Sequence, residues 1–320
     1  MKRIVAVAVS VALLIILVWH VDAQALLRNL RATRWGLFAL ALALFVPQTL
    51  VIAWRWKRLT APFTALPLAE STRMILAGAT MNLVLPGKLG DLTKAWFMVQ
   101  NGRVSLPLAV GIVVFEKMLD VATLALFMLL GTAALVLTTH NDLPVPLPGL
   151  AMAAGLGLAA VIGVALLYFV PLSRLPGYEK LRERAAASPA LARVHQLLTG
   201  SQNTMATLQS RGANRAEIIT LSLAIWVLHL GQIALFFLSL NAHVTLAQFF
   251  TAVPLAIFIG LIPISVAGFG TRDAALVTLL PTLPASLVLA AAFYINLRYI
   301  VPALAGIPFL ARYAALRKKS

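Results

Sequence analysis

Long apolar stretches almost free of charge are the feature that most constrains the fold of this 320-residue chain. A helix needs about 20 apolar residues to cross the hydrocarbon core of a bilayer. Stretches long enough to cross lie at residues 4–21, 35–54, 106–139, 150–172, 217–240 and 286–311. Only 11% of the residues are charged, against about 25% in a soluble domain. The sequence therefore predicts an all-α polytopic membrane protein with about six full transmembrane helices.

Two further apolar segments are short and interrupted. Residues 74–87 end in Pro86-Gly87, and a second short helix is expected at 91–100. Residues 246–263 end at Pro263, and a helix is expected to restart near Arg272. A segment of 14 residues is too short to span a bilayer. We expect two re-entrant or broken helical hairpins, which makes eight hydrophobic segments in all.

The order of these segments repeats along the chain. Span, basic segment, span, broken hairpin and span describe residues 1–140, and the same order describes 150–311. Each half has an odd number of full spans, so the second half must be inverted relative to the first. We therefore expect residues 1–320 to form a single integral membrane domain built as an inverted repeat. Cleavage of residues 4–21 as a signal peptide, which the sequence also allows, would break this symmetry, so we favour a retained first helix.

The basic residues predict the orientation. The chain carries 26 Lys and Arg against 10 Asp and Glu, a net charge of +16. Most of the basic residues fall near the two termini, after residue 54, and in the polar segment 173–215, which the order of the spans places on one face of the membrane. Only Arg28, Arg31 and Arg34 lie on the opposite face. Cytoplasmic loops are enriched in Lys and Arg, so both termini are expected in the cytoplasm. Segment 173–215 is expected to form amphipathic helices on the membrane surface.

Cysteine and histidine give no sign of a metal site. The chain has no Cys, and its five His show no metal-ligand spacing. We expect no metal, no cofactor and, because the chain is poor in charge overall, no nucleic-acid partner.

The first hairpin carries an anion-binding pattern. Gly87 and Gly90 flank Lys88, and the following helix begins near Asp91 and Lys94. The free N–H groups of a helix N-terminus attract anions, so this segment is a candidate cradle for a phosphate head group. The alternative is a capped helix break whose charges pair only with each other.

Residues Glu116, Lys117 and Asp120 place three charges within a predicted span. Ionisable groups at this depth are retained only when they are paired or face a polar cavity. One interpretation is an acid pair that couples or balances charge, and the other is a buried salt-bridge cluster that stabilises helix packing.

The second hairpin has a related pattern. Gly268 and Gly270 allow close backbone approach, and Arg272 and Asp273 follow them. A guanidinium binds phosphate oxygens through paired donors, so Arg272 is a candidate ligand-binding residue. Arg298 lies within the last span. It is expected either to meet Glu116 or Asp120 or to face an anionic ligand.

These motifs together resemble the lysylphosphatidylglycerol synthase transmembrane-region family, also called flippase-like domain proteins. The resemblance rests on the order and spacing of Asn82-x-x-x-Pro86-Gly87-Lys88-x-Gly90-Asp91-x-x-Lys94, Glu116-Lys117-x-x-Asp120, Gly268-x-Gly270-x-Arg272-Asp273 and Arg298. In bifunctional members the membrane domain moves an aminoacylated phospholipid between leaflets, and a soluble domain makes that lipid. The resemblance implies translocation without synthesis, and thus not an enzyme, in the inner membrane of a bacterium.

The resulting hypothesis is a lipid translocase. Lys88, Lys94, Arg272 and Arg298, with the four hairpin glycines, would bind an anionic head group, and Asp91, Glu116, Lys117, Asp120 and Asp273 would balance or couple charge. The cargo would be a phospholipid, an aminoacyl-phospholipid or a polyprenyl- or hopanoid-linked lipid, and enzymes of lipid synthesis or glycosyltransferases are the expected partners. The alternatives are an integral-membrane transferase acting on a lipid-linked phosphate and a scaffold for glycolipid assembly.

Overall fold

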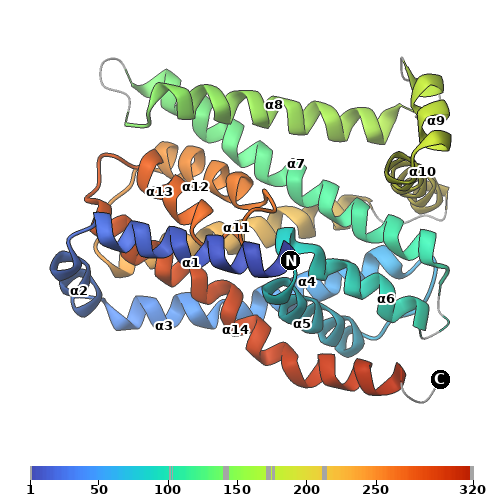
Figure 1. Ribbon diagram of the computed structural model, residues 1–320, viewed down its shortest axis with the longest axis horizontal. Helices are drawn as coiled ribbons and strands as arrows, with labels where there is room; N and C mark the ends of the chain where they lie inside the picture. Colours follow the sequence, from blue (N-terminus) through green and yellow to red (C-terminus); the bar gives the residue numbers. More distant parts are fainter. Residues whose placement is uncertain are drawn as a thin grey trace.

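The computed structural model describes residues 2–100, 102, 104–139, 144–170, 174, 177–210 and 215–317. In this part of the chain every regular element is a helix, and Figure 1 shows the helices as one elongated bundle. The first half holds α1 (Lys2–His20), α2 (Ala23–Arg31), α3 (Trp35–Ala43), α4 (Phe45–Thr60), α5 (Leu68–Val84), the 3-10 helix η1 (Pro86–Asp91), α6 (Leu92–Gln100) and α7 (Leu106–Thr138). The second half holds α8 (Leu147–Phe169), α9 (Tyr178–Ala187), α10 (Pro189–Ser210), α11 (Arg215–Ser239), α12 (Leu246–Gly260), α13 (Thr271–Leu279) and α14 (Ala285–Arg317).

The helix lengths confirm an all-α polytopic membrane protein. Five helices of the described chain are long and apolar enough to cross a bilayer, at Trp35–Thr60, Leu106–Thr138, Leu147–Leu166, Arg215–Ser239 and Ala285–Tyr313. The pair α1 and α2, bent by 94°, forms a sixth candidate. The first of these spans continues to Thr60, six residues beyond the predicted boundary at Trp54, and Arg55 lies inside it. Our assignment of Arg55 to a cytoplasmic flank was therefore wrong.

Both predicted breaks are present. Helix α5 ends at Val84 and is followed by η1 and α6. Helix α12 ends at Gly260, and ten residues separate it from α13, which begins at Thr271. In the second break Gly268 and Gly270 have φ angles of 80° and 85°, which residues with a side chain adopt only at a cost.

The two halves pack reciprocally. The long helix α14 of the second half packs on α5 of the first, and α7 of the first half packs on α12 of the second. Both crossings use a glycine: Gly306 lies against the carbonyl of Leu76, and Gly131 lies against the backbone of Phe250. Likewise, α2 packs on α14 and α10 packs on α7. Each half thus packs its last long helix on a hairpin helix of the other half. The inverted repeat itself stays a prediction.

The polar segment between α8 and α11 forms two helices in its described part. Helix α10 packs against α7, where Gly111 lies close to Thr204, and α9 packs on α10. Figure 1 shows α9 at the same end of the molecule as the C-terminal end of α14, and α2 at the opposite end. The basic residues of α9 and Arg312 of α14 therefore lie toward the same end of the molecule. The orientation of the termini stays a prediction.

Candidate functional site

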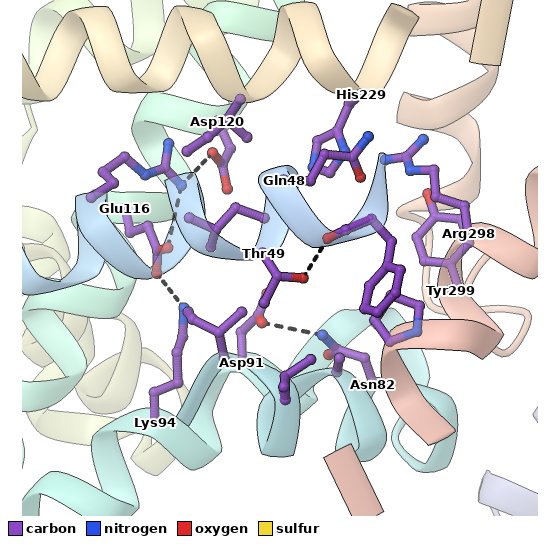
Figure 2. Close-up of a pocket in the computed structure, with 18 of the residues that line it drawn as sticks. Gln48, Thr49, Asn82, Asp91, Lys94, Glu116, Asp120, His229, Arg298 and Tyr299 are labelled. Atoms are coloured by element: carbon purple, nitrogen blue, oxygen red, sulfur yellow. Dashed lines mark hydrogen bonds and ion pairs between the residues drawn. The ribbon is translucent and has the colours of Figure 1, made fainter. Parts of the chain in front are cut away.

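A cavity of about 180 Å³ lies between the two halves of the bundle. It is lined by side chains from α4, α5, the end of η1, α6 and α7 of the first half and from α11, the second break and α14 of the second half. Both interrupted hairpins contribute, through Asn82 and Leu83 from the first and Ala267 from the second. Figure 2 shows Glu116 and Asp120 on one side of this cavity and Arg298 with Tyr299 on the other.

Glu116 is held between two buried cations. One carboxylate oxygen accepts a hydrogen bond from the Nζ of Lys94, and the other lies 3.2 Å from an Nη of Arg55. All three side chains are at most 2% exposed. The ammonium of Lys94 also lies 4.5 Å from the centre of the Trp56 ring. Burial of a charge is tolerated when it is paired and hydrogen-bonded, and all three groups meet this condition.

Asp120 extends this set of ion pairs. Asp120 lies 2.7 Å from the same Nη of Arg55 and 3.1 Å from the Nζ of Lys117. Lys117 in turn lies 2.7 Å from Asp91, whose other oxygen accepts a hydrogen bond from the amide of Asn82. Lys117 is 42% exposed, so this end of the network opens toward the surface.

The network joins three acids to three bases. Arg55 also donates to the hydroxyl of Ser222 in α11, so the network ties α4, α6, α7 and α11 together. Glu116 and Asp120 therefore belong to a buried salt-bridge cluster, and this cluster also lines the cavity. Their role in coupling or balancing charge stays a prediction. The alternative in which Arg298 neutralises these acids is wrong, because Arg55 occupies that place.

The second hairpin holds a smaller polar cluster. Arg272 pairs with Asp273 at 2.9 Å and donates to Asn296, and the amide of Asn296 donates to the other oxygen of Asp273. That oxygen also accepts from the backbone N–H of Gly270 at 3.0 Å. Asp273 thereby holds the start of α13, and Arg272 and Asp273 neutralise each other.

Lys94 and Arg272 are each paired with a carboxylate, so both contribute to the packing of the site. Their expected contact with an anionic head group stays a prediction. The glycines also have a packing role: the backbone of Asn82 fills the space beside Gly90, and the carbonyl oxygen of Gly260 lies 3.0 Å from where a Cβ on Gly268 would be. A Cβ on Gly270 would meet Leu13 of α1.

The remaining predicted residues of the first hairpin are Gly87 and Lys88. Gly87 and Lys88 lie within η1, and the side chain of Lys88 is outside the described part of the structure. Their expected contact with a head group stays a prediction.

Arg298 is different from the other cations of the site. It is 7% exposed and lines the cavity, and it forms no ion pair with a carboxylate among the described residues. Its Nη1 atom is buried without a hydrogen-bond partner in that part of the chain, and its guanidinium lies 5.0 Å from the centre of the Tyr299 ring. Arg272 lies at the same distance from this ring.

Sequence reasoning missed several residues of the cavity. Arg55 follows an interfacial-looking Trp54, so it was placed outside the span. Gln48, Thr49 and His229 line the cavity as well. Gln48 donates to Gln232 of α11 at 3.1 Å, and no spacing pattern on either helix predicts this pair. Among the described residues, no group of three or more Asp, Glu or His side chains has a metal-binding arrangement.

The comparison with family models decides the family. Residues 3–306 match the model described as the lysylphosphatidylglycerol synthase TM region. The chain belongs to this family. A search of curated proteins gives no match. As a member of the lysylphosphatidylglycerol synthase transmembrane-region family, the chain is a membrane domain, and the matched residues include every charged side chain of the cavity.

Proposed function

We propose that this protein is a lipid translocase of the flippase-like type. Its cargo is a phospholipid, an aminoacyl-phospholipid or a polyprenyl- or hopanoid-linked lipid with an anionic head group. The observation that carries the proposal is a buried arginine, Arg298, which has no counter-ion among the described residues and lies in a cavity that both halves of the bundle line. An uncompensated buried cation is costly, and an anionic ligand removes this cost.

The walls of the cavity suit transport better than catalysis. Asp91, Glu116 and Asp120 are each bound to at least one cation, so none of them is left as a general base. Paired short helices, interrupted by Gly and Pro at the interface of two halves, are the usual setting of a transporter site. In this scheme the head group enters between the hairpins, Arg298 binds it, and the tail stays in the bilayer.

The proposed location is the inner membrane of a bacterium, with both termini in the cytoplasm. This orientation places α9 and the basic end of α14 against the anionic cytoplasmic leaflet, which attracts Lys and Arg.

Reconstitution into liposomes tests the proposal. Fluorescent phospholipids and polyprenyl phosphates are incorporated, and the rate at which they become accessible to a membrane-impermeant quencher is compared with that of empty liposomes. We expect faster movement of at least one anionic lipid, and loss of the acceleration in Arg298→Gln but not in Arg58→Gln. Arg58 is an exposed arginine paired with Glu217, so its substitution is a matched control. Equal rates with and without the protein for every lipid would reject the proposal.

A further inference from the structure

A second cavity lies on a different face of α11. Its volume is about 360 Å³, against about 180 Å³ for the charged cavity. Its walls come from α7, α11, the turn that follows α11, and α12. Among the described residues that line it, His243 is the only one with a polar side chain. This apolar cavity is therefore separate from the candidate site, and its chemistry is different.

Small residues of α11 leave the space open, and aromatic rings border it. Gly231 and Ala234 lie three residues apart on α11, and therefore on the same face of this helix. No neighbouring side chain lies within 4 Å of the position that a Cβ on Gly231 would take. Phe127 of α7 stacks on Phe250 of α12, with the ring centres 5.6 Å apart. This stacked pair joins the two helices that face α11 across the apolar cavity.

The apolar cavity has the depth of one leaflet. Its lining on α11 begins at Val227, in the middle of the helix, and continues to Leu238 near its end. The step of 11 residues between them corresponds to a rise of about 16 Å. This is about half of the ~30 Å thickness of the hydrocarbon core. His243, in the turn after α11, then lies at the end of the apolar cavity that is nearer to the membrane surface.

Hydrocarbon is the medium that this cavity meets. Helices α7 and α11 are both long and apolar enough to cross a bilayer, and Val227, Leu238 and Leu246 of the lining are exposed. A buried water makes about three hydrogen bonds to polar groups, and these walls do not offer them. An empty cavity loses the dispersion contacts of its walls. A hydrocarbon chain from the bilayer supplies these contacts and leaves no polar group unpaired.

We propose that the apolar cavity binds one hydrocarbon chain of a bilayer lipid, whose head group lies near His243. The chain is an acyl or a prenyl chain, because both present only hydrocarbon to the walls. The inference goes beyond the translocase function and does not depend on it, since a lipid chain can be held here without being transported.

Photolabelling of the full-length protein in vesicles tests the inference. Phosphatidylcholine vesicles contain a small fraction of a phosphatidylcholine with a diazirine near the end of one acyl chain. A second series contains a polyprenyl phosphate with the same group on its chain. After irradiation, mass spectrometry of peptides compares the labelling of α11 around Val227 with that of α8 around Leu158 and Ile162. These three side chains are 56%, 53% and 55% exposed, so α8 reports ordinary contact with the bilayer.

We expect several-fold more label at Val227 and Gly231 than on α8. Gly231→Phe places a ring in the open space and should lower the labelling of the apolar cavity several-fold. Ala234→Leu is a second filling variant and should act in the same direction. Gly155→Phe in α8 is the matched control, because no atom lies within 4 Å of its Cβ position, and it should leave the labelling of the apolar cavity unchanged. Thermal unfolding in detergent shows whether each variant is folded.

Three outcomes would overturn the inference. Equal labelling of α11 and α8 in the wild-type protein would mean annular contact only. Weaker labelling of α11 than of α8 would mean that another surface, such as a second copy of this chain, covers the apolar cavity. The third is unchanged labelling in both folded filling variants. The comparison of α11 with α8 in the wild-type protein does not depend on the folding of any variant. Preferential labelling by either the acyl or the prenyl probe supports the site and identifies the chain that it binds.

Discussion

The guanidinium of Arg55 in α4 lies 2.7 Å from the carboxylate of Asp120 in α7. The same nitrogen lies 3.2 Å from Glu116, one helical turn earlier. Arg55 thereby pairs with the two acids that one of the two interpretations had offered to Arg298, and Arg298 has no ion pair with a described carboxylate. The placement of this one arginine makes the ion-pair network of three acids and three bases neutral, and in the described part of the chain Arg298 lines the same cavity without a carboxylate partner.

Substitution of Glu116 is expected to destabilise the protein strongly. Glu116→Gln leaves Lys94 and Arg55 buried with one acid fewer, and removal of one partner of a buried pair costs about 3–5 kcal/mol. The measurement is the free energy of unfolding in detergent. Glu217→Gln is the matched control, because Glu217 pairs with Arg58, whose side chain is 45% exposed, and an exposed pair contributes about 1 kcal/mol or less. Equal effects of the two substitutions would contradict the burial of the network, and the double variant Lys94→Gln/Glu116→Gln should recover part of the loss.

The crossing of α5 and α14 depends on Gly306. A Cβ there would overlap the carbonyl of Leu76, so Gly306→Ala must shift one helix. Overpacking of this kind costs about 1–3 kcal/mol. Gly155→Ala in α8 is the control, since no atom lies within 4 Å of its Cβ position, and alanine stabilises a helix by up to about 1 kcal/mol relative to glycine. Thermal unfolding in detergent should therefore move in opposite directions for the two variants.

Helix α1 contacts the break between α12 and α13 through Ser10. Its hydroxyl accepts a hydrogen bond of 2.8 Å from the backbone N–H of Val266 in the break. Ser10→Ala leaves this buried N–H without the bond and should cost about 1–3 kcal/mol. Ser105→Ala, which removes an exposed hydroxyl that makes no capping hydrogen bond, should change the free energy of unfolding by much less. No difference between the two variants would show that α1 does not hold the break.

The same contacts predict that α1 is retained in the mature protein. Its removal would uncover Val266 and the face of Gly270 that packs on Leu13. Intact-mass measurement of protein purified from membranes should include residues 1–25. A mass lacking them would indicate cleavage as a signal peptide.

Single cysteines can test the orientation, since the chain has none of its own. Glu183→Cys in α9 and Gln24→Cys in α2 place a thiol at exposed positions at opposite ends of the molecule. We expect a membrane-impermeant maleimide to label only the α2 thiol in intact spheroplasts, and both thiols after permeabilisation. The reverse pattern would mean that the termini lie outside the cytoplasm.

Much of the architecture follows from local sequence. The apolar lengths of α7, α8, α11 and α14 predict helices that cross a bilayer, and Pro86, Gly268 and Gly270 mark the two breaks because proline and glycine disrupt regular helices. The apolar stretches also predicted that Glu116, Lys117, Asp120 and Arg298 lie at membrane depth. Arg55 is the exception, because a basic residue just after a tryptophan has the pattern of a membrane interface.

The sequence alone did not show which charged side chains pair with each other across the bundle. Lys94, Arg272 and Arg298 were all candidates for binding an anion, since all three are basic residues in broken or apolar helices. Whether a buried cation is free depends on which carboxylate lies within about 4 Å of it, and that distance is set by helices far apart in the chain. Hydropathy and helix breakers therefore predicted the spans and the expected depth of the charges, because both act locally along the chain. Tertiary packing alone decided that Glu116 and Asp273 neutralise Lys94 and Arg272 and that Arg298 has no counter-ion among the described residues.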